Sequence, residues 1–207
     1  MRKRQSGFSL IELLIVIAII MVIAAMATPN VMNAINNIRL RAGASELAGL
    51  LQQCRQRAVK DNRYYTVKPT NLTGSGLAAY VDLNFNNSFD NVAPSPEPLI
   101  QFPANISVNS GAPNTANLKN NCCSTFTPQN QNILPSFNSR GLPCVSPGGN
   151  PPPANSVCNI RDASNNPVGF LYTMNQPRPF GAVGWAAVSV TPAGRIRVWT
   201  YSGTTWQ

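Results

Sequence analysis

Glu12 is a carboxylate inside an apolar segment, and its position requires a chemical explanation. Residues 8–27 contain only two polar side chains, Ser9 and Glu12. A carboxylate within such a segment costs about 3 kcal/mol on insertion scales, and residues of this kind are by default paired and functional. We therefore expect Glu12 to be paired with an opposite charge and to have a functional role.

Cations and aromatic rings alternate near the C-terminal end of the chain. In residues 195–201 a period of two places Arg195, Arg197, Trp199 and Tyr201 on one face of an expected strand. Such a face suits phosphate contacts and base stacking, which is the sequence-tolerant mode of nucleic-acid binding. The alternative is that the arginines are solvated and that Trp199 covers the edge of the sheet.

A third candidate is a loop with oxygen side chains at alternating positions. Positions 1, 3, 5 and 9 of this loop are filled by Asp82, Asn84, Asn86 and Asp90, the spacing with which EF-hand-like loops surround calcium. The bidentate acid expected at position 12 is missing, since Ala93 stands there and Glu97 is displaced. We expect weak calcium binding at most and no other cofactor, and an Asn-rich turn between strands is the alternative.

The composition argues against an enzyme. The 207-residue chain contains no His and only seven Asp and Glu residues. The absence of His removes the commonest general base, the commonest metal ligand and any Ser-His or Cys-His nucleophilic pair. The net charge of +9 permits a polyanion or an anionic membrane surface as a partner without requiring one.

A long helix must position Glu12. As a helix, residues 8–28 span roughly 30 Å, the thickness of a bilayer's hydrocarbon core. The basic run at residues 2–4 stays in the cytoplasm by the positive-inside rule, which places the rest of the chain outside it. A cleaved secretory signal peptide is the alternative, but it does not explain Glu12.

The helix is expected to continue beyond Pro29. Apolar residues at spacings of three and four form one face over residues 29–61, and we expect this amphipathic half to pack on a globular head. Several Asn and Gly residues in the same half predict a bend or local melting. The sequence thus predicts one stem helix over residues 8–61.

Residues 62–207 predict a β-rich head. The clearest pair of strands is joined by the turn-forming residues 192–194 and predicts a hairpin. Residues 110–165 are dominated by Asn, Pro, Ser and Gly and lack a strong apolar face, so we expect a surface insertion there. The expected strands are residues 64–68, 77–83, 99–102, 106–109, 168–174, 185–191 and 195–201.

Four of the five cysteines fall in this insertion, namely Cys122, Cys123, Cys144 and Cys158. In extracytoplasmic, loop-rich regions disulfides compensate for a small core. Because adjacent cysteines bond to each other only with strain, we expect Cys122 and Cys123 each to pair with Cys144 or Cys158, in either combination. Cys54 lies on the apolar helix face and is expected to be a buried thiol. A zinc site is the rival interpretation, but the chain has neither His nor a C-x-x-C motif.

The N-terminal sequence resembles a known signal. The heptapeptide GFSLIEL at residues 7–13, after a short basic leader and before an unbroken apolar run, is similar to the class III signal of type IV pilins and pseudopilins. The resemblance implies that a prepilin peptidase cuts after Gly7, removes the leader 1–7 and methylates the new amine of Phe8. That amine, on a staggered neighbour, would then pair with Glu12 and set the register between subunits.

Two further segments resemble the GspH/FimT group of minor pilins and pseudopilins. They are residues 54–60 of the helix and the Gly-Arg-x-Arg sequence at residues 194–197. The resemblance implies an α+β, type IV pilin-like fold, in which a long stem helix packs on an antiparallel β-sheet head, here with a disulfide-stabilised loop insertion. Some members of the group cap type II secretion pseudopili, while others belong to type IV pili, where the Gly-Arg-x-Arg motif is implicated in DNA capture.

These features predict a non-enzymatic filament subunit. The resemblance implies a single-pass protein of the bacterial inner membrane with its head in the periplasm, later extracted into a pilus or pseudopilus. Its implied partners are other pilins or pseudopilins, the prepilin peptidase and an inner-membrane assembly platform. The sequence leaves open a type II secretion role, DNA capture through Arg195, Arg197 and Trp199, and a major structural pilin.

Overall fold

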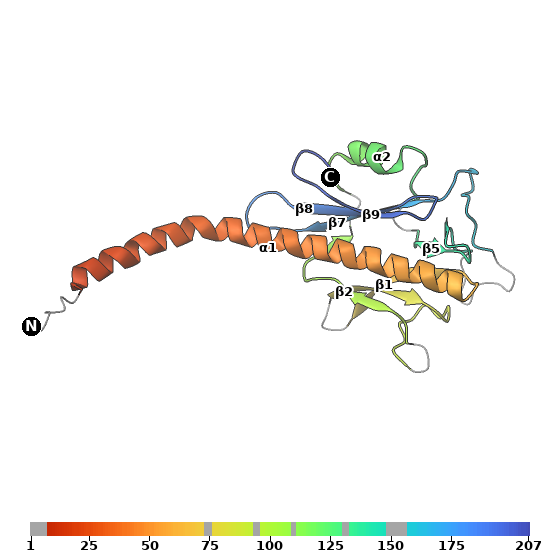
Figure 1. Ribbon diagram of the computed structural model, residues 1–207, viewed down its shortest axis with the longest axis horizontal. Helices are drawn as coiled ribbons and strands as arrows, with labels where there is room; N and C mark the ends of the chain where they lie inside the picture. Colours follow the sequence, from red (N-terminus) through yellow and green to blue (C-terminus); the bar gives the residue numbers. More distant parts are fainter. Residues whose placement is uncertain (1–7, 73–75, 93–95, 109–110, 130–132, 148–156) are drawn as a thin grey trace, which may run out of the picture.

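The computed structural model describes residues 8–72, 76–92, 96–108, 111–129, 133–147 and 157–207. One long helix, α1, projects from a head that contains all of the strands (Figure 1). The expected α+β architecture of stem helix and antiparallel head is therefore present. The expected leader, residues 1–7, lies outside the described residues.

Helix α1 spans Leu10–Lys60 without a break. The Ser9 hydroxyl caps its start by accepting a hydrogen bond of 3.2 Å from the Glu12 backbone N–H. Pro29 lies inside the helix, which follows a gentle curve (Figure 1). The stem helix is confirmed, whereas the expected local melting is not observed, because packing on the head holds the Asn- and Gly-containing half in helical form.

The head contains two sheets where one was expected, and α1 lies between them. Strands β1 and β2 lie on one side of the helix and β7, β8 and β9 on the other (Figure 1). All pairings are antiparallel, in the orders β3-β2-β1-β5-β6 and β4-β7-β8-β9. The strands are β1 Tyr65–Leu72, β2 Gly76–Asp82, β3 Leu99–Gln101, β4 Ser107–Val108, β5 Ser136–Phe137, β6 Pro143–Cys144, β7 Phe170–Gln176, β8 Gly184–Val190 and β9 Ile196–Thr200.

The core lies where each sheet meets α1. Leu50 and Leu51 of the helix pack in one buried cluster with Phe137 of the first sheet and Phe170 of the second. Cys54 belongs to the same cluster and is a free, buried thiol as expected, and burial raises the pKa of that thiol. One stripe of the helix is thus covered from both sides.

The β8–β9 hairpin is confirmed. Its turn is closed by hydrogen bonds from the Thr191 N–H to the Arg195 carbonyl at 2.9 Å and from the Gly194 N–H to the Thr191 carbonyl at 2.7 Å. Gly194 has a φ of +78°, a conformation that favours glycine. The turn chemistry of residues 192–194 therefore acts as the sequence predicted.

The insertion is more than a surface loop, which corrects the sequence-based expectation. It forms α2, Thr115–Cys123, together with β5 and β6, and it buries Leu118, Phe126 and Phe137. Helix α2 covers a second cluster, in which Leu118 packs with Trp199 and Trp206. These apolar residues are too far apart in sequence to form a periodic face, so their burial depends on sites that the sheets provide.

The expected pairing of the cysteines is wrong. The disulfides join Cys122 with Cys123, and Cys144 with Cys158 at a Cα–Cα distance of 5.4 Å. Cys122 and Cys123 stand at the end of α2, on the outer side of the second sheet. They are therefore held apart from the other two cysteines, which lie beside the first sheet.

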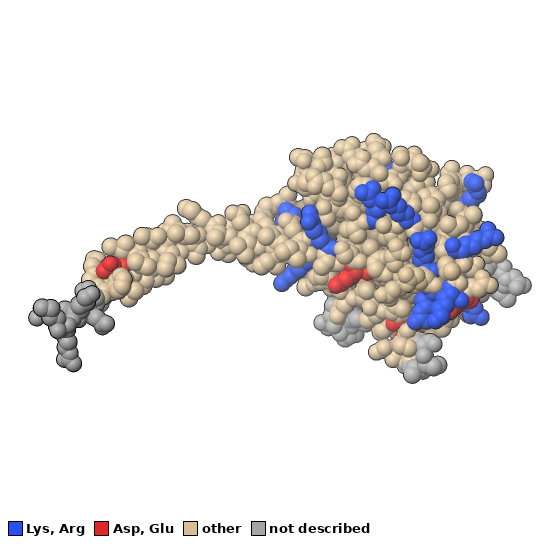
Figure 2. Space-filling view, in the orientation of Figure 1, with Lys and Arg blue, Asp and Glu red and all other residues tan. Residues whose placement is uncertain are grey.

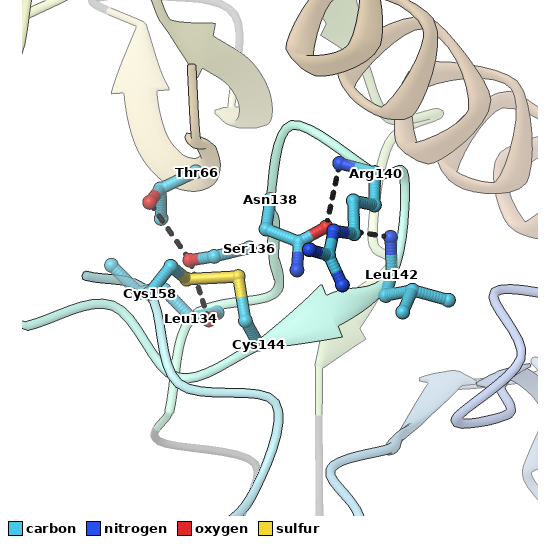
Figure 3. The surroundings of a disulfide bond; sticks show 8 residues. All are labelled: Thr66, Leu134, Ser136, Asn138, Arg140, Leu142, Cys144 and Cys158. Carbon is cyan, nitrogen blue, oxygen red and sulfur yellow. Dashed lines mark hydrogen bonds between the residues drawn. A yellow bond between two sulfur atoms is a disulfide. The ribbon is translucent and has the colours of Figure 1, made fainter. Parts of the chain in front are cut away.

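An isolated antiparallel bridge lies next to the second disulfide. Val145 pairs with Asn159 through two backbone hydrogen bonds of 2.8 and 3.2 Å, and the residues before them, Cys144 and Cys158, are joined by the disulfide (Figure 3). Ser136 of β5 shares a hydrogen bond of 2.8 Å with Thr66 nearby. The disulfide thus fastens the segment that extends the first sheet.

Replacing both Cys144 and Cys158 by Ala should lower the free energy of unfolding by about 3 kcal/mol, because the disulfide closes a 14-residue separation. The matched control replaces Cys122 and Cys123 by Ala. Because these two cysteines are adjacent in sequence, their disulfide closes almost no loop, and its loss should lower the free energy of unfolding far less. Urea denaturation measures both variants. Peptide mapping that links Cys122 or Cys123 to Cys144 or Cys158 would contradict the pairing.

Candidate functional site

The N-terminal half of α1 is an apolar surface that the head does not cover. Phe8 and Leu10 are each 82% exposed, and Ile38 is still 68% exposed. An 18-residue window of the helix has a mean hydropathy of 3.0, and no part of that window is buried. The helix is long and apolar enough to cross a membrane, and Figure 2 shows it extending away from the head as a largely uncharged rod.

Glu12 lies in the first turn of this rod. Its side chain is exposed, and among the residues that the structure describes, Lys68 and Asp82 form the only ion pair. A cation that neutralises Glu12 must therefore come from another molecule or from beyond the described chain. Ser9 was not among the predicted site residues, although the Ser-x-x-Glu spacing of Ser9 and Glu12 is a recognisable capping signal. Gly7 lies outside the described residues, whereas Phe8 is exposed beside the helix start.

Trp199 does not share the exposed face predicted for it. The indole is 5% exposed and its Nε1–H donates a hydrogen bond of 2.9 Å to the Ser189 hydroxyl. Trp206 and α2 cover the ring from outside the sheet, which leaves no surface on which a base could stack. Of the two interpretations of Trp199, the structure supports the one in which it is a covering residue.

Arg195, just before β9, and Arg197, within it, remain exposed. The Arg197 guanidinium carbon lies 4.4 Å from the centroid of the Trp199 ring, a cation–π contact that orients the side chain along the sheet. Neither arginine is ion-paired with any carboxylate that the structure describes. The cationic part of the predicted surface is therefore present without its aromatic part.

Gly194 joins this strand to the stem helix. Arg55 of α1 donates a hydrogen bond of 3.0 Å from Nη1 to the Gly194 carbonyl. A Cβ at Gly194 would lie 2.8 Å from the carbonyl oxygen of Gly141, so the close approach requires glycine. Neither Arg55 nor Gly141 was predicted from the sequence, because nothing local connects them to the hairpin.

The predicted calcium loop is closed by its own hydrogen bonds. The Glu97 carboxylate accepts hydrogen bonds from the backbone N–H groups of Leu83 at 2.8 Å and Asp90 at 3.0 Å. The Lys68 ammonium donates to the carboxylate of Asp82, which is buried. Sequence spacing alone had set Glu97 aside, but it is 5% exposed and anchors the loop.

The side-chain amides of Asn84 and Asn86 complete the hydrogen-bond network of this loop. Asn84 donates from its amide to the Asp90 carboxylate at 2.6 Å, and Asn86 donates to the same oxygen. Within the described ranges, no three side chains of His, Cys, Asp or Glu lie close enough together to hold an ion. Calcium binding at Asp82, Asn84, Asn86 and Asp90 therefore stays a prediction.

The loop nevertheless concentrates negative charge. Asp82, Asp90 and Glu97 are three of the seven acidic residues of the chain, and of these only Asp82 forms an ion pair within the described residues, with Lys68. Burial, and then the nearby charges of these three carboxylates, raise the pKa of Tyr80 to about 12. One buried oxygen of Asp82, Oδ1, has no hydrogen-bond partner in the structure.

Comparison with known proteins adds one family match. Residues 2–28 match the prokaryotic N-terminal methylation motif, so the predicted N-terminal signal is confirmed, and Gly7, Phe8 and Glu12 all lie within it. Comparison with curated proteins finds no match. A solved structure, the type IV minor pilin FimU of Pseudomonas aeruginosa PAO1, shares 16% sequence identity with a TM-score of 0.41, covering 81% of this chain and 92% of that chain.

Calcium should bind the loop weakly, in the millimolar range, because Lys68 already occupies the Asp82 carboxylate. Lys68→Met keeps the aliphatic stem and removes the competing ammonium, so it should strengthen binding. Isothermal calorimetry measures both proteins, with Lys119→Met as a control for lost charge elsewhere. Absence of heat from the Lys68 variant at millimolar calcium would exclude the metal site.

Proposed function

We propose that the protein is a non-enzymatic filament subunit, a minor pilin or pseudopilin of a type IV pilus or a type II secretion pseudopilus. The observation that carries this proposal is the methylation motif at residues 2–28 together with a helix whose first half has no partner among the described residues. An apolar rod of this length needs a cover in water. The bilayer provides it before assembly, and other subunits provide it afterwards.

The N-terminus is processed before assembly. In this proposal a prepilin peptidase cuts on the cytoplasmic side after Gly7 and methylates the amine of Phe8. The basic residues 2–4 hold the leader inside, so α1 crosses the inner membrane once and the head lies in the periplasm. An inner-membrane assembly platform then extracts the subunit into the filament.

Glu12 sets the register of assembly. Its carboxylate has no cationic partner among the described residues, and in an apolar bundle an unpaired carboxylate is strongly unfavourable. The methylated amine of Phe8 on a neighbouring subunit satisfies it once the two helices are shifted by four residues. Any larger or smaller axial offset between the two helices leaves both charges unpaired, so the four-residue register is preferred.

Glu12→Ala should leave membrane insertion and cleavage intact and reduce co-assembly about tenfold, because the register contact is lost. Pull-down of a tagged full-length chain with an untagged copy from membranes measures co-assembly, and mass spectrometry of the N-terminus verifies cleavage. Ser9→Ala, which removes only the helix cap, is the matched control. Wild-type co-assembly by Glu12→Ala would refute this role.

DNA capture is a second candidate function, favoured by the exposed, unpaired arginines Arg195 and Arg197. Since Trp199 is buried, binding would rest on phosphate contacts rather than on stacking of bases. The described face of the head in Figure 2 carries many cationic and few acidic side chains, which suits a polyanion. This activity would be added to assembly and would not replace it.

Replacing Arg195 and Arg197 together by Ala should weaken DNA binding and reduce the salt dependence, the slope of log K against log salt, by about 2. Fluorescence anisotropy with a labelled oligonucleotide at several salt concentrations gives this slope. The control, Lys119→Ala with Arg161→Ala, removes the same charge elsewhere. If both double variants lose binding equally, the effect is one of net charge and the β9 site is excluded.

A further inference from the structure

A hollow of about 810 Å³ opens where the stem enters the head. Its walls are residues 34–41 of α1, the connection between β7 and β8, and the end of β9 with the residues that follow it. The β7–β8 connection lies at the end of the head from which the bare stem projects (Figure 1). This hollow, the junction pocket, is therefore on the side of the head that faces the membrane segment.

Among the described residues, the lining of the junction pocket contains two guanidinium groups and no carboxylate. The Arg178 guanidinium donates a hydrogen bond from Nη2 to the Asn37 side chain, while its buried Nε has no hydrogen-bond partner in the structure. Arg41 is exposed and makes one long hydrogen bond of 3.4 Å to the Thr200 hydroxyl. Neither guanidinium is ion-paired within the part of the chain that the structure describes, so both are available to an anion.

One wall of the junction pocket is apolar and continues toward the membrane segment. Ile38 lines the pocket and is 68% exposed. The exposed residues Val31 and Ile35 lie seven and three positions before it, on the same face of the helix. Val183 of the β7–β8 connection also lines the pocket and is exposed. The pocket thus suits a molecule that has both an anionic group and an apolar part.

The expected membrane span ends close to the pocket. Ala34, which lines the pocket, is six residues beyond Thr28, or about 9 Å along the helix. The headgroup layer adds about 5 to 8 Å on each side of the hydrocarbon core, and long cationic side chains reach toward it. A lipid whose acyl chain follows the apolar face of residues 31–38 therefore brings its phosphate to the guanidinium groups.

We propose that the junction pocket binds the headgroup of an anionic phospholipid from the membrane that α1 crosses. The proposal rests on the membrane-anchored state of the proposed function and adds a lipid partner to it. Arg41 and Arg178 hold the phosphate, and the wall at Ile38 holds the start of an acyl chain. A phospholipid is favoured over a free anion because only an amphiphile occupies both walls, and basic pockets beside membrane helices bind anionic headgroups in this way. The bound lipid fixes the orientation of the head on the bilayer before the subunit is extracted.

Lipid retention by the full-length chain tests the pocket. The protein, purified in a neutral detergent, is mixed with equal amounts of phosphatidylglycerol and phosphatidylcholine of one chain length, and native mass spectrometry counts the bound lipids. Phosphatidylglycerol should be retained about tenfold more, because only this lipid has a net negative charge. Replacing Arg41 and Arg178 together by Gln should abolish the preference. The control, Arg39→Gln with Arg63→Gln, removes the same charge from exposed positions outside the pocket and should keep it.

Three results would overturn the lipid site. They are equal retention of the two lipids, an equal loss of preference in the control pair, and displacement of the lipid by inorganic phosphate at the same concentration, which would show a site for free anions. Thermal unfolding at the wild-type temperature verifies that the variants are folded. Arg41→Gln alone, at an exposed position, should lower the preference about threefold and repeats the test should the double variant unfold.

Alkaline extraction of membranes separates this proposal from the proposed function. A full-length chain that the extraction releases does not span the membrane, and the proposed function then fails together with the lipid site. A chain that stays in the membrane but shows no lipid preference overturns the lipid site alone.

Discussion

One continuous helix has to satisfy two different surroundings, and the rest of the structure follows from this constraint. The C-terminal half of α1 is buried between two sheets, with Leu50 and Leu51 in the core. No part of the chain that the structure describes covers the N-terminal half, and Leu10 is 82% exposed. Because the helix has no break, whatever covers the bare half is rigidly coupled to the head. Any contact made along the bare half therefore also positions the head.

The ionic groups divide in the same way between those satisfied inside the molecule and those left for a partner. Lys68 and Asp82 form an internal pair, and Glu97 anchors the adjoining loop through two backbone N–H groups. Glu12 and Glu46, both on α1, form no pair within the described chain. Burial makes an unpaired charge costly, so a partner that covered either carboxylate would need to bring a cation.

Local patterns predicted the elements well and their contacts poorly. The stem helix, the β8–β9 hairpin and the buried Cys54 follow from periodicity and turn residues within a few positions of each other. The cysteine pairing and the burial of Trp199 depend on α2, which a segment rich in Asn and Pro did not suggest. At Gly194 the turn was predicted from the sequence, but the hydrogen bond that its carbonyl accepts from Arg55 was not.

The sequence by itself determined the bare stem, its methylation motif, the position of Glu12 and the order of the main strands, because each depends on spacings along one stretch of backbone. Only the tertiary structure decided that two sheets enclose α1, that Cys144 bonds Cys158, and that Trp199 is covered while Arg195 stays exposed. The physical reason is that these contacts join residues distant in sequence, and their energies appear only when both sheets have closed over the helix.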